Sequence, residues 1–320
     1  MAKKFLTLLV AGLLCAGALA QNYPSRPVRF IVPFAAGGGT DLIARRLAQK
    51  LSLALGQPVI VDNRPGASGV IGTDLTAKAA PDGYTLMIAT PTFTVNPSMM
   101  AKLPYDVAQD FAPVALIATS PHLLAVNPTL PVKTIPELVA YAKSHKEPLT
   151  YSSGSTGGSS HLAGELFNSV AGIRLVHIPY KGTGEAARAV VSGTVQLAFL
   201  DVQTMLPLVN AGLLRAIAVT GAARSTVVPA LPTIAESGYP GFESGVWYGV
   251  LAPARTPPAV ITRLNAEIVR IMQNPEMLNT LSHLGAEPAA NSPAAFAQLI
   301  QAELPRWSKV IRESGLQQAN

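Results

Sequence analysis

Short apolar runs that fit β-strands alternate along this chain with longer stretches whose apolar residues recur at helical spacing. The runs predict strands over residues 28–32, 59–61, 85–89, 112–118, 123–126, 149–151, 174–178, 197–200, 216–220 and 248–252. The helical spacing predicts helices over residues 41–55, 69–79, 134–144, 159–171, 184–192, 202–211, 257–273, 275–284 and 293–313. This alternation is typical of an α/β fold with mostly parallel strands, in which ligands bind beyond the carboxyl ends of the strands.

The first twenty residues differ from the rest and fit an export signal. Lys3 and Lys4 precede an apolar run over residues 5–14, and the small residues at 18–20 fit a cleavage site. A lipoprotein signal at Cys15 is the weaker alternative, because Leu14 occupies the position where a small residue is expected. No later apolar run reaches the ~20 residues that a membrane-spanning helix needs. We therefore expect an exported protein whose mature chain begins at about Gln21.

Composition limits what this exported chain can bind. Cleavage removes Cys15, the only cysteine, so no disulfide is expected, and residues 21–320 suffice for one large or two medium domains. Loss of Lys3 and Lys4 lowers the 24 Lys and Arg to 22, against 18 Asp and Glu, and the remaining basic residues are scattered. Nucleic-acid surfaces cluster their basic residues, so no nucleic-acid partner is expected. The five histidines lack metal-ligand spacing, so no metal site is expected either.

Residues 33–41 carry the strongest functional signal in the chain. Gly37, Gly38 and Gly39 lie between the strand predicted at 28–32 and the helix predicted at 41–55. Glycines let a backbone turn sharply and approach a ligand closely, and the first amides of a helix have no intrahelical partner. We therefore expect this loop to bind a carboxylate or phosphate through backbone N–H groups. Valine at Gly38 is expected to abolish binding, because its side chain would fill the anion site and resist a positive φ.

A second loop repeats this design. Residues 152–161 are rich in Ser and Gly, follow a predicted strand and open the next predicted helix. Residues 90–92 and 180–184 are further candidate loops at strand ends, and Asp201 ends the strand predicted at 197–200. Asp favours helix starts, so Asp41 is expected to brace its loop and Asp201 to cap a helix, rather than to act as acids or bases. Asp201 could also accept a hydrogen bond from a ligand.

Enzyme motifs are incomplete in both loops. A phosphate-binding P-loop needs a lysine after its last glycine, and a dinucleotide-binding fold needs a glycine where Leu42 stands. Residues 157–161 lack the closing glycine of a hydrolase nucleophile elbow. An exported hydrolase that uses Ser155 or Ser159 with His161 is therefore a minor alternative, and no cofactor is expected. His161 fits a capping or packing role about as well as a ligand contact.

Several segments together resemble the substrate-binding receptors of tripartite tricarboxylate transporters, the TctC or Bug family. They extend over nearly all of the mature chain, at residues 23–29, 33–41, 61–66, 80–84, 105–106, 110–114, 177–182 and 231–236. Two of the longer ones are Tyr23-Pro24-Ser25-Arg26-Pro27-Val28-Arg29 and His177-Ile178-Pro179-Tyr180-Lys181-Gly182. Each segment alone is weak evidence, but their order and spacing are specific.

The resemblance implies a type II periplasmic binding protein fold, with two α/β lobes that clamp a ligand and a two-strand hinge. It implies a first lobe at residues 21–124 plus 248–320 and a second lobe at residues 125–247. By this resemblance the protein is a periplasmic, monomeric receptor rather than an enzyme. It would capture a small organic carboxylate and deliver it to membrane permease subunits. A ligand sensor for a membrane signalling partner would use the same pocket and stays an alternative.

By the same resemblance, the two glycine-containing loops grip the carboxylate and neighbouring loops complete the site. The implied ligand-binding residues are Phe34, Ala36, Gly37, Gly38, Thr40, Thr90, Ser153, Ser155, Thr156, Gly157, His161, Tyr180, Thr183 and Asp201. Neither principal loop contains Lys or Arg, so amide and hydroxyl dipoles would neutralise the carboxylate. Backbone donors to an anion are about twice as strong as neutral hydrogen bonds, but they do not discriminate what lies beyond the carboxylate.

Overall fold

The computed structural model describes residues 23–34 and 36–316, and the predicted signal segment lies outside these residues. The strands are β1 (Val28–Val32), β2 (Val59–Asn63), β3 (Thr85–Ala89), β4 (Phe111–Val126), β5 (Thr150–Ser153), β6 (Val176–Pro179), β7 (Leu197–Asp201), β8 (Arg215–Val219), β9 (Gly245–Pro253) and β10 (Glu287–Pro288). The helices are α2 (Gly39–Leu55), the short 3₁₀ turn η1 (Ala67–Gly69), α3 (Val70–Ala77), α4 (Thr92–Met99), α5 (Ile135–Ser144), α6 (Ser159–Ala171), α7 (Thr183–Val191), α8 (Val202–Asn210), α9 (Pro258–Met272), α10 (Pro275–His283) and α11 (Pro293–Ser314).

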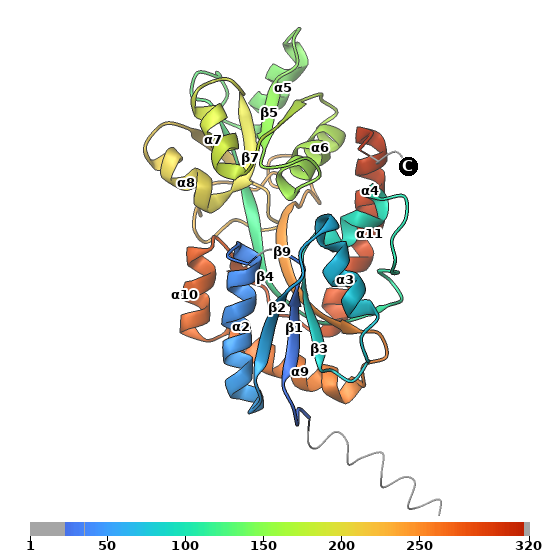
Figure 1. Ribbon diagram of the computed structural model, residues 1–320. Coiled ribbons are helices and arrows are strands. Elements are labelled where there is room, and N and C mark those ends of the chain that lie inside the picture. Colours follow the sequence, from blue (N-terminus) through green and yellow to red (C-terminus); the bar gives the residue numbers. More distant parts are fainter. Residues whose placement is uncertain (1–22, 35, 317–320) are drawn as a thin grey trace, which may run out of the picture.

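The strands form a curled sheet that runs through two lobes, and β4 and β9 connect the lobes (Figure 1). The order along the sheet is β2-β1-β3-β9-β4-β7-β5-β6, and β8 and β10 pair with β4 outside this path. The outer strands of each lobe pair in parallel, whereas β4 and β9 run antiparallel to their neighbours. This is the α/β fold that the sequence pattern predicted, in the two-lobed arrangement with a two-strand hinge that the family resemblance implied.

Strand β4 is continuous and belongs to both lobes. Residues 111–121 pair with β9, whereas residues 122–126 pair with β7 and β8. We call the part built on β1, β2, β3, β9 and β4 up to Pro121 the first lobe, and the part built on β4 from His122 with β5–β8 the second lobe. The sequence analysis predicted two strands here, and Pro121, which has no N–H to donate to a ladder, lies between them. The residue boundaries predicted for the lobes stay a prediction.

Strands of both lobes are buried on both faces. In β1, Phe30 belongs to an apolar cluster with Leu47 of α2, whereas Ile31 belongs to a cluster on the opposite face with Phe296 of α11. The strands of the second lobe are likewise covered by α5 and α6 on one face and by α7 and α8 on the other. Strands covered on two faces consist of nearly unbroken apolar runs, which is why the sequence located them.

Helix α11 packs against both lobes. Phe296 and Ile300 contribute to an apolar cluster of the first lobe, and Trp307 and Ile311 contribute to a cluster of the second. Figure 1 shows α11 running alongside both lobes. This helix therefore links the lobes in addition to the two hinge strands.

Helix α4 is the main element that the sequence analysis missed. It begins at Thr92, directly after the loop that follows β3, and contains Pro97. Its eight residues show little helical periodicity of apolar positions, so contacts with α11 and η1 rather than its own pattern account for the helix. None of the helices in the described part of the chain is long and apolar enough to cross a membrane.

Gly249 of β9 has no side chain, and an aromatic ring of α11 packs into the space beside it. A Cβ at this position would overlap the ring of Phe296. Overpacking a core costs about 1–3 kcal/mol, so we expect Gly249→Ala to lower the free energy of unfolding by that amount in urea titrations. Gly184→Ala is the matched control, because the nearest atom to its new Cβ would be Arg188 Nη1 at 3.8 Å. Equal stability of the two variants would contradict this packing argument.

Candidate functional site

A pocket lies between the two lobes beside the hinge strand β9. Its volume is about 220 Å³. It is lined by Phe34, Gly39, Thr40, Thr90, Pro91, Thr92 and Val95 of the first lobe, by Gly157, Ser159 and Leu162 of the second, and by Val246 and Tyr248 of β9. An adjoining pocket shares Phe34, Thr92, Val95 and Gly157 and adds Ser68, Asn96, Met99, Met100, Ser155, Thr156 and Gly158. We call the two together the interlobe pocket.

The two glycine-containing loops have the same backbone conformation, one in each lobe. Gly37 has a φ of +88°, and Gly38 is the extended N-cap of α2 with φ −78° and ψ 167°. Gly157 has a φ of +73°, and Gly158 is the extended N-cap of α6 with φ −75° and ψ 167°. The interlobe pocket is therefore bounded by two copies of one local geometry.

Each loop is held by a side chain four residues after its left-handed glycine. The Gly37 N–H donates to Asp41 Oδ2 at 2.8 Å, and the Gly157 N–H donates to His161 Nδ1 at 2.9 Å. The same bond is thus made by a carboxylate in one lobe and by an imidazole in the other.

Asp41 braces the first loop, as the sequence predicted. It is 1% exposed and also accepts hydrogen bonds from Arg45 Nε and Asn63 Nδ2, each at 2.9 Å. Burial opposes ionisation of Asp41, but the hydrogen bonds from Arg45, Gly37 and Asn63 outweigh it and hold the pKa of this carboxyl below its usual value. Ionised Asp41 thereby keeps the turn at Gly37 fixed.

His161 braces the second loop as a neutral acceptor. It is 2% exposed and stacks on His177, with ring centroids 3.6 Å apart. Because the Gly157 N–H occupies Nδ1, the ring proton is on Nε2, which lies 3.7 Å from Glu165 Oε1. Burial, and then the adjacent His177, lower the pKa of His161 to about 3. Burial also lowers the pKa of His177 to about 4.

The helices that follow the two loops begin without side-chain caps in the described structure. Leu42 and Leu162 donate the bonds to the N-cap carbonyls of α2 and α6, so the amides before them have no partner within either helix. Gly39, Thr40 and Ser159 supply such amides and line the interlobe pocket. Uncapped helix N-termini are suited to binding anions, because their amides and the positive end of the helix dipole face outward.

The positive φ expected at Gly38 is wrong. Gly38 is extended, and the left-handed residue is Gly37, one position earlier. An N-cap residue takes a β-region conformation while its carbonyl already accepts the first helical bond, so the sharp turn falls on the residue before it. The conformational argument for glycine therefore applies to Gly37 and, in the second lobe, to Gly157.

Some of the predicted site residues line the interlobe pocket and others do not. Phe34, Thr40, Thr90, Ser155, Thr156 and Gly157 line it. Ala36, Gly37, Gly38, Ser153, His161, Tyr180, Thr183 and Asp201 are not among the residues that line it. Ligand contact by any of these residues stays a prediction.

The predicted second-lobe residues that do not line the pocket contact other residues of the same lobe. Ser153 is fully buried, and its hydroxyl donates to the Ser155 carbonyl at 2.9 Å. Asp201 Oδ1 accepts from the Thr204 N–H at 2.8 Å, so Asp201 caps α8 as predicted. The Thr183 hydroxyl lies 3.2 Å from that of Thr204, and Tyr180 packs against the apolar cluster that includes α7 and α8.

In the described residues, the serine hydroxyls that the hydrolase alternative requires do not hydrogen-bond to its expected general base. His161 Nδ1 is occupied by the Gly157 amide, and neither Ser155 nor Ser159 hydrogen-bonds to His161 in the described residues. Ser153 Oγ lies 2.6 Å from His177 Nε2, but its single proton is donated to the Ser155 carbonyl, so the imidazole is the donor. This arrangement does not activate a serine nucleophile.

The structure also adds pocket residues that were not among the predicted ligand-binding residues. Thr92, from the predicted loop at 90–92, begins α4, Val95 belongs to the same helix, which was not predicted, and Leu162 lies near the start of α6. Tyr248 packs in the first-lobe core and lines the pocket as well. Burial, followed by the negative charge of Asp201, raises the pKa of Tyr248 to about 12, so its hydroxyl stays protonated and able to donate.

Known proteins resemble this chain over nearly its whole length. The family described as "Tripartite tricarboxylate transporter family receptor" (TctC) matches residues 43–316. The protein BugT of Bordetella pertussis is 39% identical over 304 residues, which cover 94% of this chain and 93% of BugT.

Solved structures show the same fold. A TctC solute-binding protein from Polaromonas has a TM-score of 0.84 at 28% identity, covering 91% of this chain and 99% of that one. The R. palustris protein Rpa4515, solved with adipate, has a TM-score of 0.74 at 38% identity, covering 92% and 98%. MatC from Rhodopseudomonas palustris, solved with bound malate, has a TM-score of 0.71 at 34% identity, covering 90% and 100%.

Proposed function

We propose, since the chain belongs to the TctC family of tripartite tricarboxylate transporter receptors, that it captures a small organic carboxylate in the interlobe pocket. The observation that carries this proposal is the pair of uncapped helix N-termini, α2 and α6, that approach one pocket from opposite lobes with the same loop geometry. Each N-terminus offers backbone amides to an anion, and two of them can hold one carboxylate group from both sides.

The lining of the pocket favours a carboxylate with a short carbon chain. No charged side chain lines the interlobe pocket in the described structure, so amides, hydroxyls and helix dipoles must offset the ligand's charge. Phe34, Val95, Leu162 and Val246 supply apolar walls that suit methylene groups. The adipate and malate in two neighbouring structures are carboxylates of this kind.

Lobe closure would complete the binding reaction. Amides on both lobes gain their full interaction with the carboxylate only when the lobes approach, so the ligand shifts an open–closed equilibrium of the hinge. Membership of the family supports the last step of the proposal, delivery of the carboxylate to membrane permease subunits in the periplasm.

Thermal shift of the mature protein with paired ligands tests the binding proposal. Mono- and dicarboxylates with four to six carbons are compared with their neutral methyl esters. At a concentration 100 times its Kd, the cognate carboxylate should add about 2.7 kcal/mol of stability, and its ester should add none. Failure of every carboxylate, or equal stabilisation by the esters, would refute the proposal. Loss of uptake of that carboxylate in a strain without this gene tests delivery separately.

A further inference from the structure

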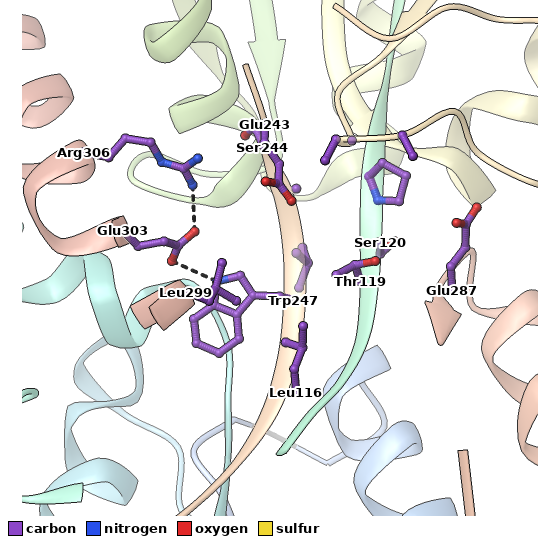
Figure 2. A pocket seen from close by; sticks show the side chains of 16 residues that line it. Leu116, Thr119, Ser120, Glu243, Ser244, Trp247, Glu287, Leu299, Glu303 and Arg306 are labelled. Carbon is purple, nitrogen blue, oxygen red and sulfur yellow. Dashed lines mark hydrogen bonds and ion pairs between the residues drawn. The ribbon is translucent and has the colours of Figure 1, made fainter. Parts of the chain in front are cut away.

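Glu303 of helix α11 is a buried carboxylate that accepts hydrogen bonds from three side chains. It is 3% exposed. Its Oε1 accepts from Arg306 Nη2 at 2.8 Å, and its Oε2 accepts from Trp247 Nε1 at 2.9 Å and from Thr94 Oγ1 at 2.6 Å. Figure 2 shows Glu303 between Arg306 and Trp247, in a cavity that all three line. A buried charge is costly unless it is paired and hydrogen-bonded, and Glu303 meets both conditions.

The indole of Trp247 ties Glu303 to the hinge strand β9. Successive residues of a strand point to opposite faces, so Trp247 faces Glu303 whereas its neighbour Tyr248 lines the interlobe pocket. Trp247 is not among the residues that line that pocket. The bond from Trp247 therefore acts on the strand that carries Tyr248, from the face away from the candidate ligand site.

The hydroxyl of Thr94 ties Glu303 to helix α4. A helix turns by about 100° per residue, so Thr94 points away from the side on which Thr92 and Val95 line the pocket. The Thr94 hydroxyl also lies 3.0 Å from the Pro91 carbonyl oxygen. Its single proton goes to Glu303, because two acceptor oxygens 2.6 Å apart would otherwise repel each other. Glu303 thus joins α4 to β9 behind the walls that both elements contribute to the pocket.

Helix α4 depends on contacts of this kind. It has eight residues, contains Pro97 and begins without a side-chain cap in the described structure. A helix this short is marginal without tertiary contacts. Val95 of α4 belongs to the same apolar cluster as Leu162 of α6, so the first lobe contacts the second through α4. The position of α4 therefore affects both the pocket wall and the fit between the lobes.

We propose that Glu303 is a positioning residue for ligand binding, which holds α4 against β9 and thereby fixes the pocket-lining side chains of both. Walls that are ordered beforehand cost less to immobilise when a ligand binds, so loss of this tie should weaken binding while the protein stays folded. The effect on affinity rests on the proposed carboxylate binding, whereas the hold on α4 does not need a ligand.

Hydrogen exchange of the protein without ligand, measured by mass spectrometry, tests the hold on α4. Thr94→Val keeps the shape of the side chain but removes the hydroxyl, and it should speed exchange of the α4 amides about tenfold. Thr94→Ser keeps the hydroxyl and should restore slow exchange. Thr76→Val is the matched control in α3, because it removes a fully buried hydroxyl that bonds to the Gly72 carbonyl at 3.0 Å. Unchanged α4 exchange in Thr94→Val, or equal acceleration in Thr76→Val, would overturn the proposal.

Calorimetric titration then tests the effect on binding. The probe is the four- to six-carbon carboxylate that stabilises the unchanged protein most, with adipate tried first. Its affinity should fall about tenfold in Thr94→Val and stay unchanged in Thr94→Ser and Thr76→Val, at a temperature where circular dichroism shows each variant folded. Faster α4 exchange with unchanged affinity would reduce Glu303 to a structural role and overturn the proposal. If no carboxylate binds the unchanged protein, the proposed function fails, and the exchange measurement still decides whether α4 is held.

A double-mutant cycle tests whether Thr94 acts through Glu303. Glu303→Met removes the acceptor while keeping the length of the side chain. In this background Thr94→Val should cause no further acceleration of α4 exchange and no further loss of affinity, because the bond is already absent. Additive effects would show that the Thr94 hydroxyl acts through the Pro91 carbonyl instead, and would overturn the assignment to Glu303.

Discussion

Gly157→Val is expected to lower the affinity for the bound carboxylate by about 100-fold or more, which corresponds to ~2.7 kcal/mol. Gly157 has a φ of +73°, a conformation that costs a non-glycine residue about 1–2 kcal/mol and a β-branched residue more. Its new Cβ would also lie 3.1 Å from Met99 Cε of the opposite lobe. The Met99 methyl group can move aside, but the strain at φ +73° is relieved only if the loop shifts, which would break the bond from the Gly157 N–H to His161.

The shift of the Gly157 loop weakens ligand binding because it moves the first amides of α6. Once the loop shifts, the amides around Ser159 no longer point at the position where the α2 amides also converge. A hydrogen bond to a charged group is worth about 1.5–3 kcal/mol, so loss of one or two accounts for the expected change. Calorimetric titration of the cognate carboxylate at one pH measures it directly.

Gly212→Val is the matched control for backbone strain. Gly212 has a φ of +71° and lies in the turn between α8 and β8, and a Cβ added there would have no neighbouring heavy atom within 4 Å. Both variants should lose similar stability, but only Gly157→Val should lose ligand affinity. Equal affinities of the two variants, whether high or low, would show that the Gly157 loop does not align the anion-binding amides.

Both loops could be located from the sequence because glycine marks positions where the backbone adopts a conformation that other residues disfavour. Left-handed Gly37 and Gly157 each precede an extended N-cap, and that order can be anticipated only once the start of the helix is known to a single residue. The predicted start of α2 was Asp41, whereas the helix begins at Gly39, so the sequence did not show which of the three glycines takes the left-handed turn.

Other parts of the site depend on contacts between residues that are far apart in the sequence, and no local sequence pattern reveals such contacts. Helix α4 carries Thr92 and Val95 into the pocket, yet its own residues do not predict a helix. The stacking of His161 on His177 joins α6 to β6, so the sequence alone could not separate a bracing histidine from a ligand contact. The role of Asp201 as a helix cap was predictable, because the bond it makes lies within three residues.

The free energy of unfolding is expected to fall as the pH decreases from about 6.5 to about 4. Burial lowers the pKa of His122 and His177 to about 4, and burial together with His177 lowers the pKa of His161 to about 3. An unfolded histidine titrates near pH ~6.5. Within this window the unfolded chain therefore binds protons that the native chain does not, and each such histidine contributes up to ~1.4 kcal/mol per pH unit to the slope.

His161 resists protonation for a geometric reason. A second ring proton would have to enter Nδ1, where it would face the Gly157 N–H at 2.9 Å and lie against the ring of His177. His161→Asn removes the titrating group while retaining a carbonyl acceptor near Gly157. We expect this variant to show a shallower dependence of unfolding free energy on pH, by up to one proton, in urea titrations at pH 7, 6 and 5.

His145→Asn is the control for this pH dependence, because His145 is exposed at the end of α5. The slope of His161→Asn should be smaller than that of His145→Asn. A slope that stays the same in His161→Asn would mean that His161 is already protonated in the native state near pH 6. Its Nδ1 could not then accept the Gly157 amide, and the parallel between Asp41 in one lobe and His161 in the other would fail.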